Sequence, residues 1–520
     1  MGRGWHQQCA TFWTDNTLNS QDPQPRGTPV PSMQQAPDIE PELSSGAKKL
    51  RKRKLNGLPW DHSGRHPGSP LFWYVILMMI RTAWDYIFRR KQVDPLPPSG
   101  GGRIFTSIHI NGLVDPLSIV HNQDSRVITM GRHDLMTMPL IGWLTRRMGA
   151  QPVIRKPEID GGVSDEEYAR SINHRTLLTM THCIAAGHNA VVMPEGKSHQ
   201  DSRLHRFKTG TMRLAFNATA IADERGLVRP VLQPVGLHYR CHHWFRTDVY
   251  VEFAEPIPIE SSRPSQNGRR LLEGKWVEPL SEDVIQLRET LFEGLSTITP
   301  DAPDWDAYRA WHLLGHLRAN ASGSPLTTLR DEVLAAREVR ELLRSTPNDP
   351  LIDSAREAAR IFYDNELDAS SLDALSLKTH SAWASGLTGL LIMILTAPIT
   401  LPSTGIQAFF AWYLGNRTDE GVDARTTYHM LAAMFSPVLV WPPIALAIAY
   451  LALGLTWMVP ITTIGIMLVF HISNLFFLRG YDLWTDFTAS RRRAKLASSA
   501  NGARIVELLA MTRSNLNVLK

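Results

Sequence analysis

Two long stretches without charged side chains constrain this chain more than any other feature. Residues 381–416 contain no Asp, Glu, Lys or Arg, and in residues 426–478 only His429 and His471 titrate near neutral pH. About 20 consecutive apolar residues let a helix cross a bilayer, and a soluble core helix needs fewer. The sequence therefore predicts an integral membrane protein with a large polar body.

Several paths through the membrane fit these stretches. Pro398 and Pro402 interrupt the first one, so two half-length helices in a re-entrant hairpin and a pair of kinked spans both fit it. Residues 430–478 suffice for two spans with a break between Gly454 and Pro460. Basic residues cluster near both ends of the membrane-associated region, which predicts that both ends are cytosolic and that the number of crossings is even.

The N-terminal part has two distinct segments. Residues 1–66 are rich in Gln, Pro, Ser and Gly without an apolar period, which predicts a disordered extension. Its basic end, residues 48–54, fits either a solvated tail or a segment attracted to anionic lipid heads. In residues 67–92 the apolar run is too short to span, and Arg81 and Asp85 interrupt it. We therefore expect an interfacial or re-entrant membrane helix there.

Strand-like runs alternate with helical stretches in residues 93–280, which indicates an α/β domain. The expected strands are 103–108, 126–129, 152–154, 190–193, 231–239 and 249–253, and the expected helices are 113–121, 135–148, 165–187 and 209–222. Residues 281–378 are charged and favour helices, which predicts a helical accessory region. Membrane-embedded helices follow in residues 379–480, and a cytosolic helix or tail in residues 481–520.

Charge and cysteine usage exclude several classes of function. Lys and Arg exceed Asp and Glu by 55 − 50 = 5, and no nucleic-acid-binding motif accompanies this modest excess. The three cysteines, Cys9, Cys183 and Cys241, are far apart and lack metal-site spacing. We expect neither a disulfide framework nor a cysteine metal site.

His109 and Asp115, in the stretch S-I-H-I-N-G-L-V-D-P-L, are the strongest candidates for catalysis. Six residues of ideal helix would separate them by about 120°, so they do not share a helix face. They meet if Asn111 and Gly112 turn the chain between a strand and a helix, where α/β folds display functional side chains. A carboxylate on one imidazole nitrogen makes the other nitrogen a better general base. The alternative is a turn whose polar residues only satisfy the backbone.

Four further blocks follow in order: P-V-I-R-K, V-V-M-P-E-G-K-S-H, R-F-K-T-G and L-Q-P-V-G-L-H-Y. Arg155 follows a short strand and suits bidentate phosphate binding. Glu195 ends another strand, and Lys208 precedes a predicted helix N-terminus at Gly210, which suits an anion. Taken singly, these blocks also fit a surface arginine, an ordinary turn and a core strand.

Together, the His-Asp block, P-V-I-R, M-P-E-G-K-S-H and L-Q-P-V-G-L resemble the motif order of the glycerolipid (PlsC-type) acyltransferase family over residues 103–240. The later layout resembles the branch that includes fungal glycerol-3-phosphate acyltransferases and bacterial relatives. The His-to-Asp spacing is one residue longer than the usual pattern, as that branch often shows, and Met193 replaces the usual Phe. The resemblance implies an α/β acyltransferase domain with a mixed sheet flanked by helices.

The resemblance also implies roles for individual residues. His109 would deprotonate the acceptor hydroxyl, Asp115 would orient His109, and Gly112 would permit close approach of the backbone. The expected substrate-binding residues are Arg155 and Lys208 for the acceptor phosphate, Pro194, Glu195 and Gly196 for the shape of the acceptor site, Lys197 and His199 as further phosphate contacts, and Gly210 at the helix start. Acyl-CoA or acyl carrier protein is the expected co-substrate, with no cofactor and no metal.

The expected reaction transfers a fatty acyl group to glycerol 3-phosphate or 1-acylglycerol 3-phosphate at a membrane, with the catalytic domain facing the cytosol. The partners are membrane lipids, the acyl donor and the phosphorylated acceptor, without nucleic acid. A transacylase or lysophospholipid-remodelling enzyme and a catalytically silent lipid-binding scaffold are the alternatives. A transporter is disfavoured because the apolar region carries no acidic residue.

Overall fold

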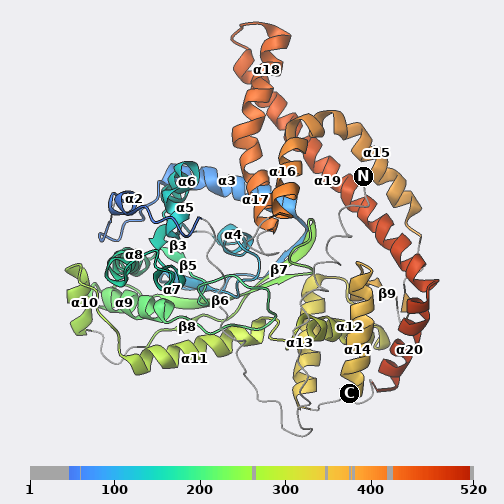
Figure 1. Ribbon diagram of the computed structural model, residues 1–520, viewed down its shortest axis with the longest axis horizontal. Coiled ribbons are helices and arrows are strands. Elements are labelled where there is room, and N and C mark those ends of the chain that lie inside the picture. The colour runs from blue at the N-terminus through green and yellow to red at the C-terminus, as the bar shows by residue number, and fades with distance from the viewer. Residues whose placement is uncertain are drawn as a thin grey trace.

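An eight-stranded sheet forms the centre of the molecule, with the strand order β1-β7-β6-β2-β5-β3-β4 and β8 paired to β6 (Figure 1). The computed structural model describes residues 46–58, 60–123, 125–260, 265–345, 349–373, 376–377, 381–417 and 425–515. The strands are β1 (Phe88–Val93), β2 (Arg103–Thr106), β3 (Val127–Arg132), β4 (Gln151–Val153), β5 (Asn189–Val191), β6 (Val231–Tyr239), β7 (Thr247–Phe253) and β8 (Ile257–Pro258). Strand β6 is antiparallel to β7 and β8, and the other pairs are parallel. The predicted mixed sheet is confirmed.

Helices pack on the sheet around one extensive apolar core, and smaller apolar clusters accompany it. The core takes residues from α3 (Pro70–Ile87), α4 (Val114–His121), α8 (Glu166–Ala185), α9 (Gly210–Glu224) and α11 (Ser281–Ile298). Shorter helices complete the domain: α5 (His133–Thr137), α6 (Pro139–Met148), α7 (Lys156–Asp160) and α10 (Ser265–Leu272). This is the α/β layer arrangement that the alternating pattern predicts.

The predicted strands are all present and differ only at their ends, whereas β1 and β8 were not predicted. The helix expected at 135–148 is divided into α5 and α6. Pro139 disfavours helical backbone in the residue before it, and Met138 is accordingly extended, with φ −64° and ψ 147°.

The expected membrane helix at 67–92 is shorter than predicted, because α3 ends at Ile87 and the next residues form β1. Pairing with β7 satisfies the backbone of this segment and makes it the edge of the sheet. One face of α3 is buried in the core, while Leu71, Tyr74 and Met78 are exposed. This two-sided helix fits an interfacial position.

The predicted disorder of residues 1–66 is wrong for its last third, and residues 1–45 lie outside the described residues. Helix α2 (Lys52–Asn56) packs on the domain and buries Leu55. Arg51 and Lys54 each donate to the Thr137 carbonyl at 3.1 Å. The basic cluster therefore docks partly against the end of α5, because its cations find a carbonyl there.

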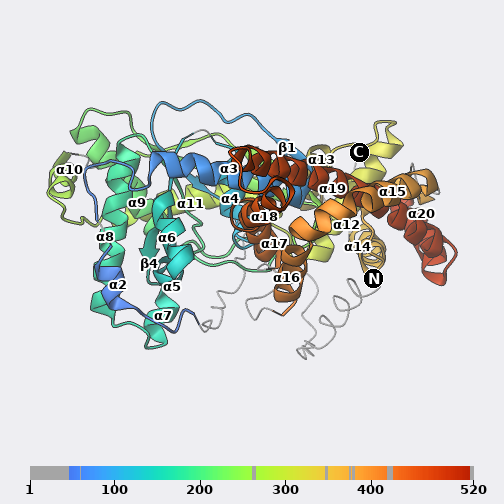
Figure 2. The ribbon, with the colours of Figure 1, turned by 90° about the horizontal axis from the view of Figure 1, so that it is seen from above.

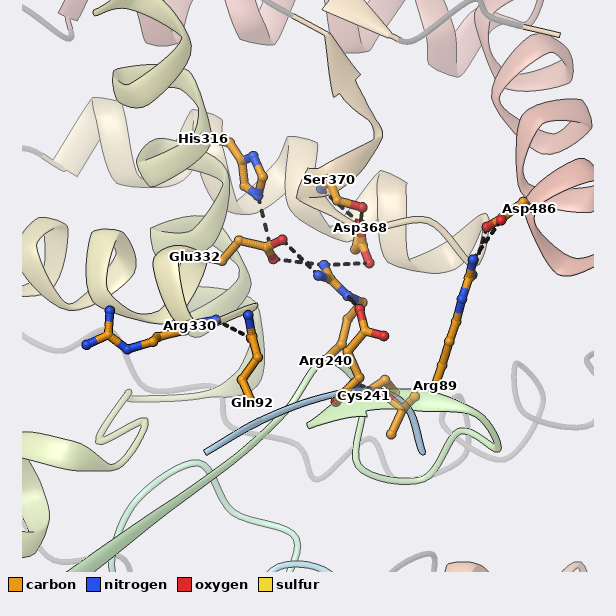
Figure 3. A network of polar contacts seen from close by, with 12 residues as sticks. Arg89, Gln92, Arg240, Cys241, His316, Arg330, Glu332, Asp368, Ser370 and Asp486 are labelled. Carbon is orange, nitrogen blue, oxygen red and sulfur yellow. Dashed lines mark hydrogen bonds and ion pairs between the residues drawn. The ribbon is translucent and has the colours of Figure 1, made fainter. Parts of the chain in front are cut away.

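The accessory region forms a second core from α12 (Trp305–Ala321), α13 (Leu329–Ser345), α14 (Asp349–Asp364) and the C-terminal helix α20 (Ala500–Asn515). A short 3₁₀ turn (Ala369–Ser371) and the two-residue strands β9 (Leu372–Asp373) and β10 (Ser376–Leu377) follow α14. Figure 3 shows how it joins the sheet: Arg240, directly after β6, donates to Glu332 on α13 at 2.8 Å and to Asp368 at 3.2 Å. Burial alone would raise the pKa of Glu332, but Arg240 and His316 hold it well below its usual range. The network is therefore an ionised link between the two cores.

Three helical segments of the described chain are long and apolar enough to cross a membrane. The first, Trp383–Gly415, joins α15 (Trp383–Thr400) to α16 (Ile406–Gly415). The second, Arg425–Leu453, joins α17 (Arg425–Phe435) to α18 (Trp441–Leu453), and the third is α19 (Val459–Ala497). Helices α15 and α19 lie side by side in both views (Figures 1 and 2).

The details differ from the predicted membrane region in two ways. The first stretch is one kinked helix, with a π-helical segment at Leu401–Gly405 that accommodates Pro402, whose ring removes a backbone donor. Helix α19 continues through the predicted boundary at residue 480 to Ala497, because its polar end packs against the body of the protein. The predicted break after Leu453 is confirmed, and Gly454 there has φ +64°.

Candidate active site

His109 and Asp115 meet at the turn between β2 and α4. His109 Nδ1 lies 3.1 Å from Asp115 Oδ2. The turn passes through Gly112, whose φ of +41° is left-handed backbone that glycine adopts without steric cost. The Asn-Gly pair therefore folds the chain back as the sequence predicts, and brings the two side chains together.

The Asp115 carboxylate is fully buried and fully hydrogen-bonded. Its Oδ2 accepts from the backbone N–H groups of Ile110 at 2.8 Å and Asn111 at 2.7 Å, and its Oδ1 accepts from the Tyr239 hydroxyl at 2.8 Å. Burial and the neighbouring Asp115 charge raise the pKa of Tyr239 well above its usual value, so the phenol stays a donor. Since a carboxylate only accepts, His109 Nδ1 carries the proton that they share.

The other ring nitrogen, His109 Nε2, has no hydrogen-bond partner among the described residues. The His109 side chain is 18 % exposed, whereas Asp115 is not exposed at all. A neutral imidazole with its Nδ1 proton fixed by a carboxylate presents the Nε2 lone pair to its surroundings. A general base requires such a fixed ring orientation.

Glu195 is a buried clamp between two loops. The turn after β5 has Gly196 at φ +74° and places the buried Glu195 carboxylate beside the His109 backbone. Its Oε2 accepts from the His109 backbone N–H at 3.1 Å, and its Oε1 accepts from the His205 backbone N–H at 2.7 Å and bonds the His199 ring at 3.0 Å. Each oxygen is thus occupied by the protein itself.

His199 lies inside this loop and is almost fully buried. Its Nε2 bonds Glu195 and its Nδ1 accepts from the Asp201 backbone N–H at 3.2 Å, while its ring stacks on His205 at 3.9 Å. Both ring nitrogens are bonded to the protein, and the phosphate contact expected of His199 stays a prediction. Lys197, two residues before His199, is also buried.

His199, Asp201 and His205 have ligand atoms within 4.8 Å of one another, the spacing of a metal site. In this arrangement His205 Nε2 bonds Asp201 at 2.6 Å, and this hydrogen bond lowers the pKa of Asp201. His199 accepts from the Asp201 backbone and stacks on His205, so the three residues together extend the Glu195 clamp.

The two predicted phosphate ligands lie at different distances from His109. Lys208 is exposed, and its backbone N–H donates to the Pro194 carbonyl at 2.8 Å, one residue before Glu195. Gly210 then begins α9. Arg155 follows β4, three strands from β2, which is roughly 14 Å at the spacing of a sheet. Its guanidinium donates to the buried Glu158 at 2.6 and 2.9 Å.

The sequence did not single out three residues that hold the catalytic turn. Tyr239 was assigned to a core strand, although a Tyr at the carboxyl end of a parallel strand is a signal that could have found it. Asn111 was counted only as part of the motif, yet its Nδ2 donates to the His242 carbonyl at 2.9 Å. Thr426 bonds Asn111 from 315 positions away, and no sequence signal points to it.

Comparison with known proteins agrees with this geometry. Residues 90–237 match the family model described as Acyltransferase. Two yeast (Saccharomyces cerevisiae) proteins are similar: Glycerol-3-phosphate O-acyltransferase 1 is 27 % identical over 30 % of this chain and 19 % of its own length, and Glycerol-3-phosphate O-acyltransferase 2 is 32 % identical over 22 % and 14 %. The chain thus matches less than a fifth of either relative.

Among solved structures, the 1-acyl-sn-glycerophosphate (LPA) acyltransferase PlsC from Thermotoga maritima aligns with 43 % of this chain and 78 % of its own, at 15 % identity and a TM-score of 0.29. The family match covers the strands and turns that carry His109, Asp115, Arg155 and Glu195. Over residues 90–237 the chain is therefore similar to the acyltransferase family and to the two yeast glycerol-3-phosphate O-acyltransferases.

Proposed function

We propose that this protein is a membrane-bound enzyme that moves a fatty acyl group from acyl-CoA or acyl carrier protein to the hydroxyl of a glycerol phosphate. The observation that carries the proposal is the His109–Asp115 pair, in which a saturated buried carboxylate leaves Nε2 accessible. Both yeast relatives are named for glycerol 3-phosphate, which favours this acceptor over its 1-acyl derivative.

In the proposed mechanism, His109 Nε2 removes the proton of the acceptor hydroxyl as its oxygen attacks the thioester carbonyl. Asp115 stabilises the imidazolium that forms, without itself taking the proton. The tetrahedral intermediate then collapses, the carbon–sulfur bond breaks, and the imidazolium returns the proton to the departing thiolate. The products are the acyl ester and a free thiol, with His109 restored to its starting state.

The acceptor phosphate is proposed to bind near Lys208 and the N-terminus of α9, with Arg155 as a second ligand. Lys208 fits because its backbone is hydrogen-bonded to Pro194 beside the Glu195 clamp. Arg155 would bind the same phosphate only by releasing Glu158. Otherwise it would bind a more distant group of the substrate. Replacing Arg155 should therefore raise the KM for the acceptor more than it lowers kcat.

The membrane arrangement is proposed to have two crossings. Both ends of the first apolar helix lie against parts of neighbouring helices that contact the body: the backbone at Gly386 is close to Phe487, next to Asp486 on α19, and that at Gly415 is close to Arg425 at the start of α17. Helix α17 starts beside Asn111, and α20 packs against α14. Since all these points lie on one side, α15 and α16 leave and re-enter on that side, and only α18 and the first half of α19 cross (Figure 1).

This arrangement keeps an even number of crossings although three helices qualify by length. It also puts the donor and the product close to lipid, where a fatty chain gains about 0.8 kcal/mol for each buried methylene. The catalytic body and both ends of the C-terminal region are proposed to face the cytosol.

The deciding experiment measures acyl transfer by the purified full chain, with labelled palmitoyl-CoA as the donor. Glycerol 3-phosphate and 1-acylglycerol 3-phosphate are offered separately, beside the His109→Ala variant. Turnover with either acceptor, lost in the variant, supports the proposal and identifies the acceptor. Transfer only from a phospholipid donor would favour a transacylase, and inactivity of wild type with every donor and acceptor would contradict the proposal.

A further inference from the structure

The catalytic turn is bonded directly to the start of α17. Thr426 donates through its hydroxyl to Asn111 Oδ1, and Leu113 donates through its backbone N–H to the Thr427 hydroxyl at 3.0 Å. Thr426 is 2 % exposed and Asn111 is 1 % exposed. The two residues on either side of Gly112 are thus held from a segment that lies more than 300 residues further along the chain.

Asn111 connects this contact to the proposed base. Its backbone N–H donates to Asp115 Oδ2, the oxygen that also bonds His109 Nδ1. Its side chain is meanwhile fixed at both ends, by Thr426 and by the His242 carbonyl. A shift of the Asn111 side chain would therefore move the backbone donor that orients Asp115.

The turn is closed locally by backbone hydrogen bonds from Val114 and Asp115 to the Asn111 carbonyl, but the Leu113 N–H has a partner from outside the turn. Gly112 has no side chain, and Leu113, the N-cap residue of α4, makes no side-chain cap. Helix N-termini leave backbone N–H groups without partners inside the helix, and Thr427 supplies an acceptor to one at this turn. Two hydroxyls from α17 add contacts to the Asn111 side chain and the Leu113 backbone.

These hydroxyls differ from others in the membrane helices. A threonine inside a helix ordinarily donates to the carbonyl four residues earlier, as Thr463 does to Val459 at 2.8 Å and Thr396 does to Ile392 at 2.8 Å. Thr426 and Thr427 occupy the first turn of α17 and direct their hydroxyls to the catalytic turn instead.

We propose that Thr426 and Thr427 are positioning residues, through which the second apolar segment, Arg425–Leu453, holds the His109–Asp115 pair in its working geometry. The inference rests on the proposed function. It assigns to the membrane region a part in catalysis beyond anchoring, because displacement of α17 would release Asn111 and Leu113.

The test uses the full chain in nanodiscs and four variants: Thr426→Val, Thr427→Val, Thr426→Ser and Thr463→Val. Valine keeps the shape of threonine and removes the hydroxyl. Thr426→Val should lower kcat about 10-fold to 100-fold, with the KM of donor and acceptor within about twofold of wild type, because small displacements at a reacting centre cost this much. Thr427→Val should act in the same direction.

Thr426→Ser keeps the hydroxyl and should recover most of the rate lost in Thr426→Val. Thr463→Val removes a hydroxyl that bonds only within α19, and it should match wild type in kcat and in thermal unfolding. An activity-independent readout is the pH profile of His109 modification by diethyl pyrocarbonate, followed by mass spectrometry. This profile should move in Thr426→Val and stay unchanged in Thr463→Val.

Two results would overturn the inference. One is wild-type kcat and an unmoved His109 profile in both valine variants. The other is that Thr426→Val and Thr463→Val change kcat, KM and the thermal unfolding temperature to the same extent, which would indicate a packing effect. If wild type transfers no acyl group at all, the proposed function fails, and the His109 profile still decides whether α17 positions the pair.

Discussion

At the scale of single residues, the buried acceptor Asp115 organises the candidate site. Two backbone N–H groups, the Tyr239 hydroxyl and His109 Nδ1 all converge on one carboxylate. Hydrogen bonds to an ionised group are roughly twice as strong as neutral ones. This concentration of donors gives His109 one orientation and one tautomer, which a general base requires.

Asp115→Asn should therefore lower kcat by about 10²-fold to 10⁴-fold, the range that general-base catalysis contributes. The amide nitrogen would face either His109 and the two backbone donors, which all bond Oδ2, or Tyr239, which bonds Oδ1, and both orientations remove the negative charge that stabilises the imidazolium. The measurement is the steady-state rate of acyl transfer, with circular dichroism to check the fold. A variant with more than half of wild-type kcat would exclude Asp115 as the partner of the base.

At the scale of elements, the ends of parallel strands are tied together by buried carboxylates. Glu195 joins the end of β5 to the loop after β2 and to the segment around His205. Both of its carboxylate oxygens are hydrogen-bonded to the protein. This favours a role in holding the His109 backbone over a role in lining an acceptor pocket.

Glu195→Ala tests this assignment. Loss of three hydrogen bonds to a buried charge should lower the thermal unfolding temperature and kcat together, with little change in the acceptor KM. Kinetics with varied acceptor and a thermal unfolding curve provide the measurement. A raised acceptor KM at unchanged unfolding temperature would instead support the acceptor-site role that the family resemblance implies.

Glu252, on β7, plays the equivalent role toward α13. Burial raises its pKa, but hydrogen bonds with His238 and Arg337 more than offset this and lower the pKa of Glu252 to about 2, from an ordinary 4.5. A carboxyl with a depressed folded pKa stabilises the fold fully above 4.5 and loses that contribution as the pH falls toward 2.

We therefore expect the thermal unfolding temperature to fall between about pH 5 and pH 3, and the fall to be smaller in Glu252→Gln. Unfolding curves of both proteins across this pH range provide the measurement. Parallel pH dependence in the two would show that other carboxyls account for the loss.

At the scale of the whole molecule, ion pairs fasten the membrane region to the α/β domain. Arg246 forms two hydrogen bonds with Asp482 on α19, at 2.9 and 2.6 Å, and donates to the Asp85 and Phe88 carbonyls at the end of α3. Arg89 pairs with Asp486 one turn further along α19. The Asp482 side chain is 3 % exposed and that of Asp486 is 42 % exposed.

Asp482→Ala should destabilise the protein by about 3–5 kcal/mol, because it leaves the buried Arg246 charge without its partner. Asp486→Ala is the matched control and should cost no more than about 1 kcal/mol, since solvent screens an exposed pair. Thermal unfolding in the same detergent compares them. Equal losses would show that Arg246 finds other partners.

The proposed two-crossing topology makes a separate prediction. In a background with Cys9→Ser, cysteines introduced at Ser322 and Ser499 should react with an impermeant maleimide from the same side of sealed vesicles. A cysteine at Trp457, 78 % exposed between α18 and α19, should react only from the other side. Opposite labelling of positions 322 and 499 would require an odd number of crossings.

The sequence by itself determined the features that depend on neighbours along the chain. Uncharged runs identified the membrane region, period and composition located the strands, and the Asn-Gly turn brought His109 to Asp115. The failures were also local: Pro139 divided a predicted helix, and residues 88–93 joined the sheet edge instead of continuing α3.

Only the tertiary structure decided which of the candidate side chains are already hydrogen-bonded to other groups of the protein. Motif spacing marked Arg155, Glu195 and His199 as substrate ligands alike, yet their polar atoms face Glu158, His109 and Asp201. It also brought Thr426 to the turn between β2 and α4. These contacts join segments up to 315 positions apart, and packing of whole elements, which no local pattern records, determines where such segments meet.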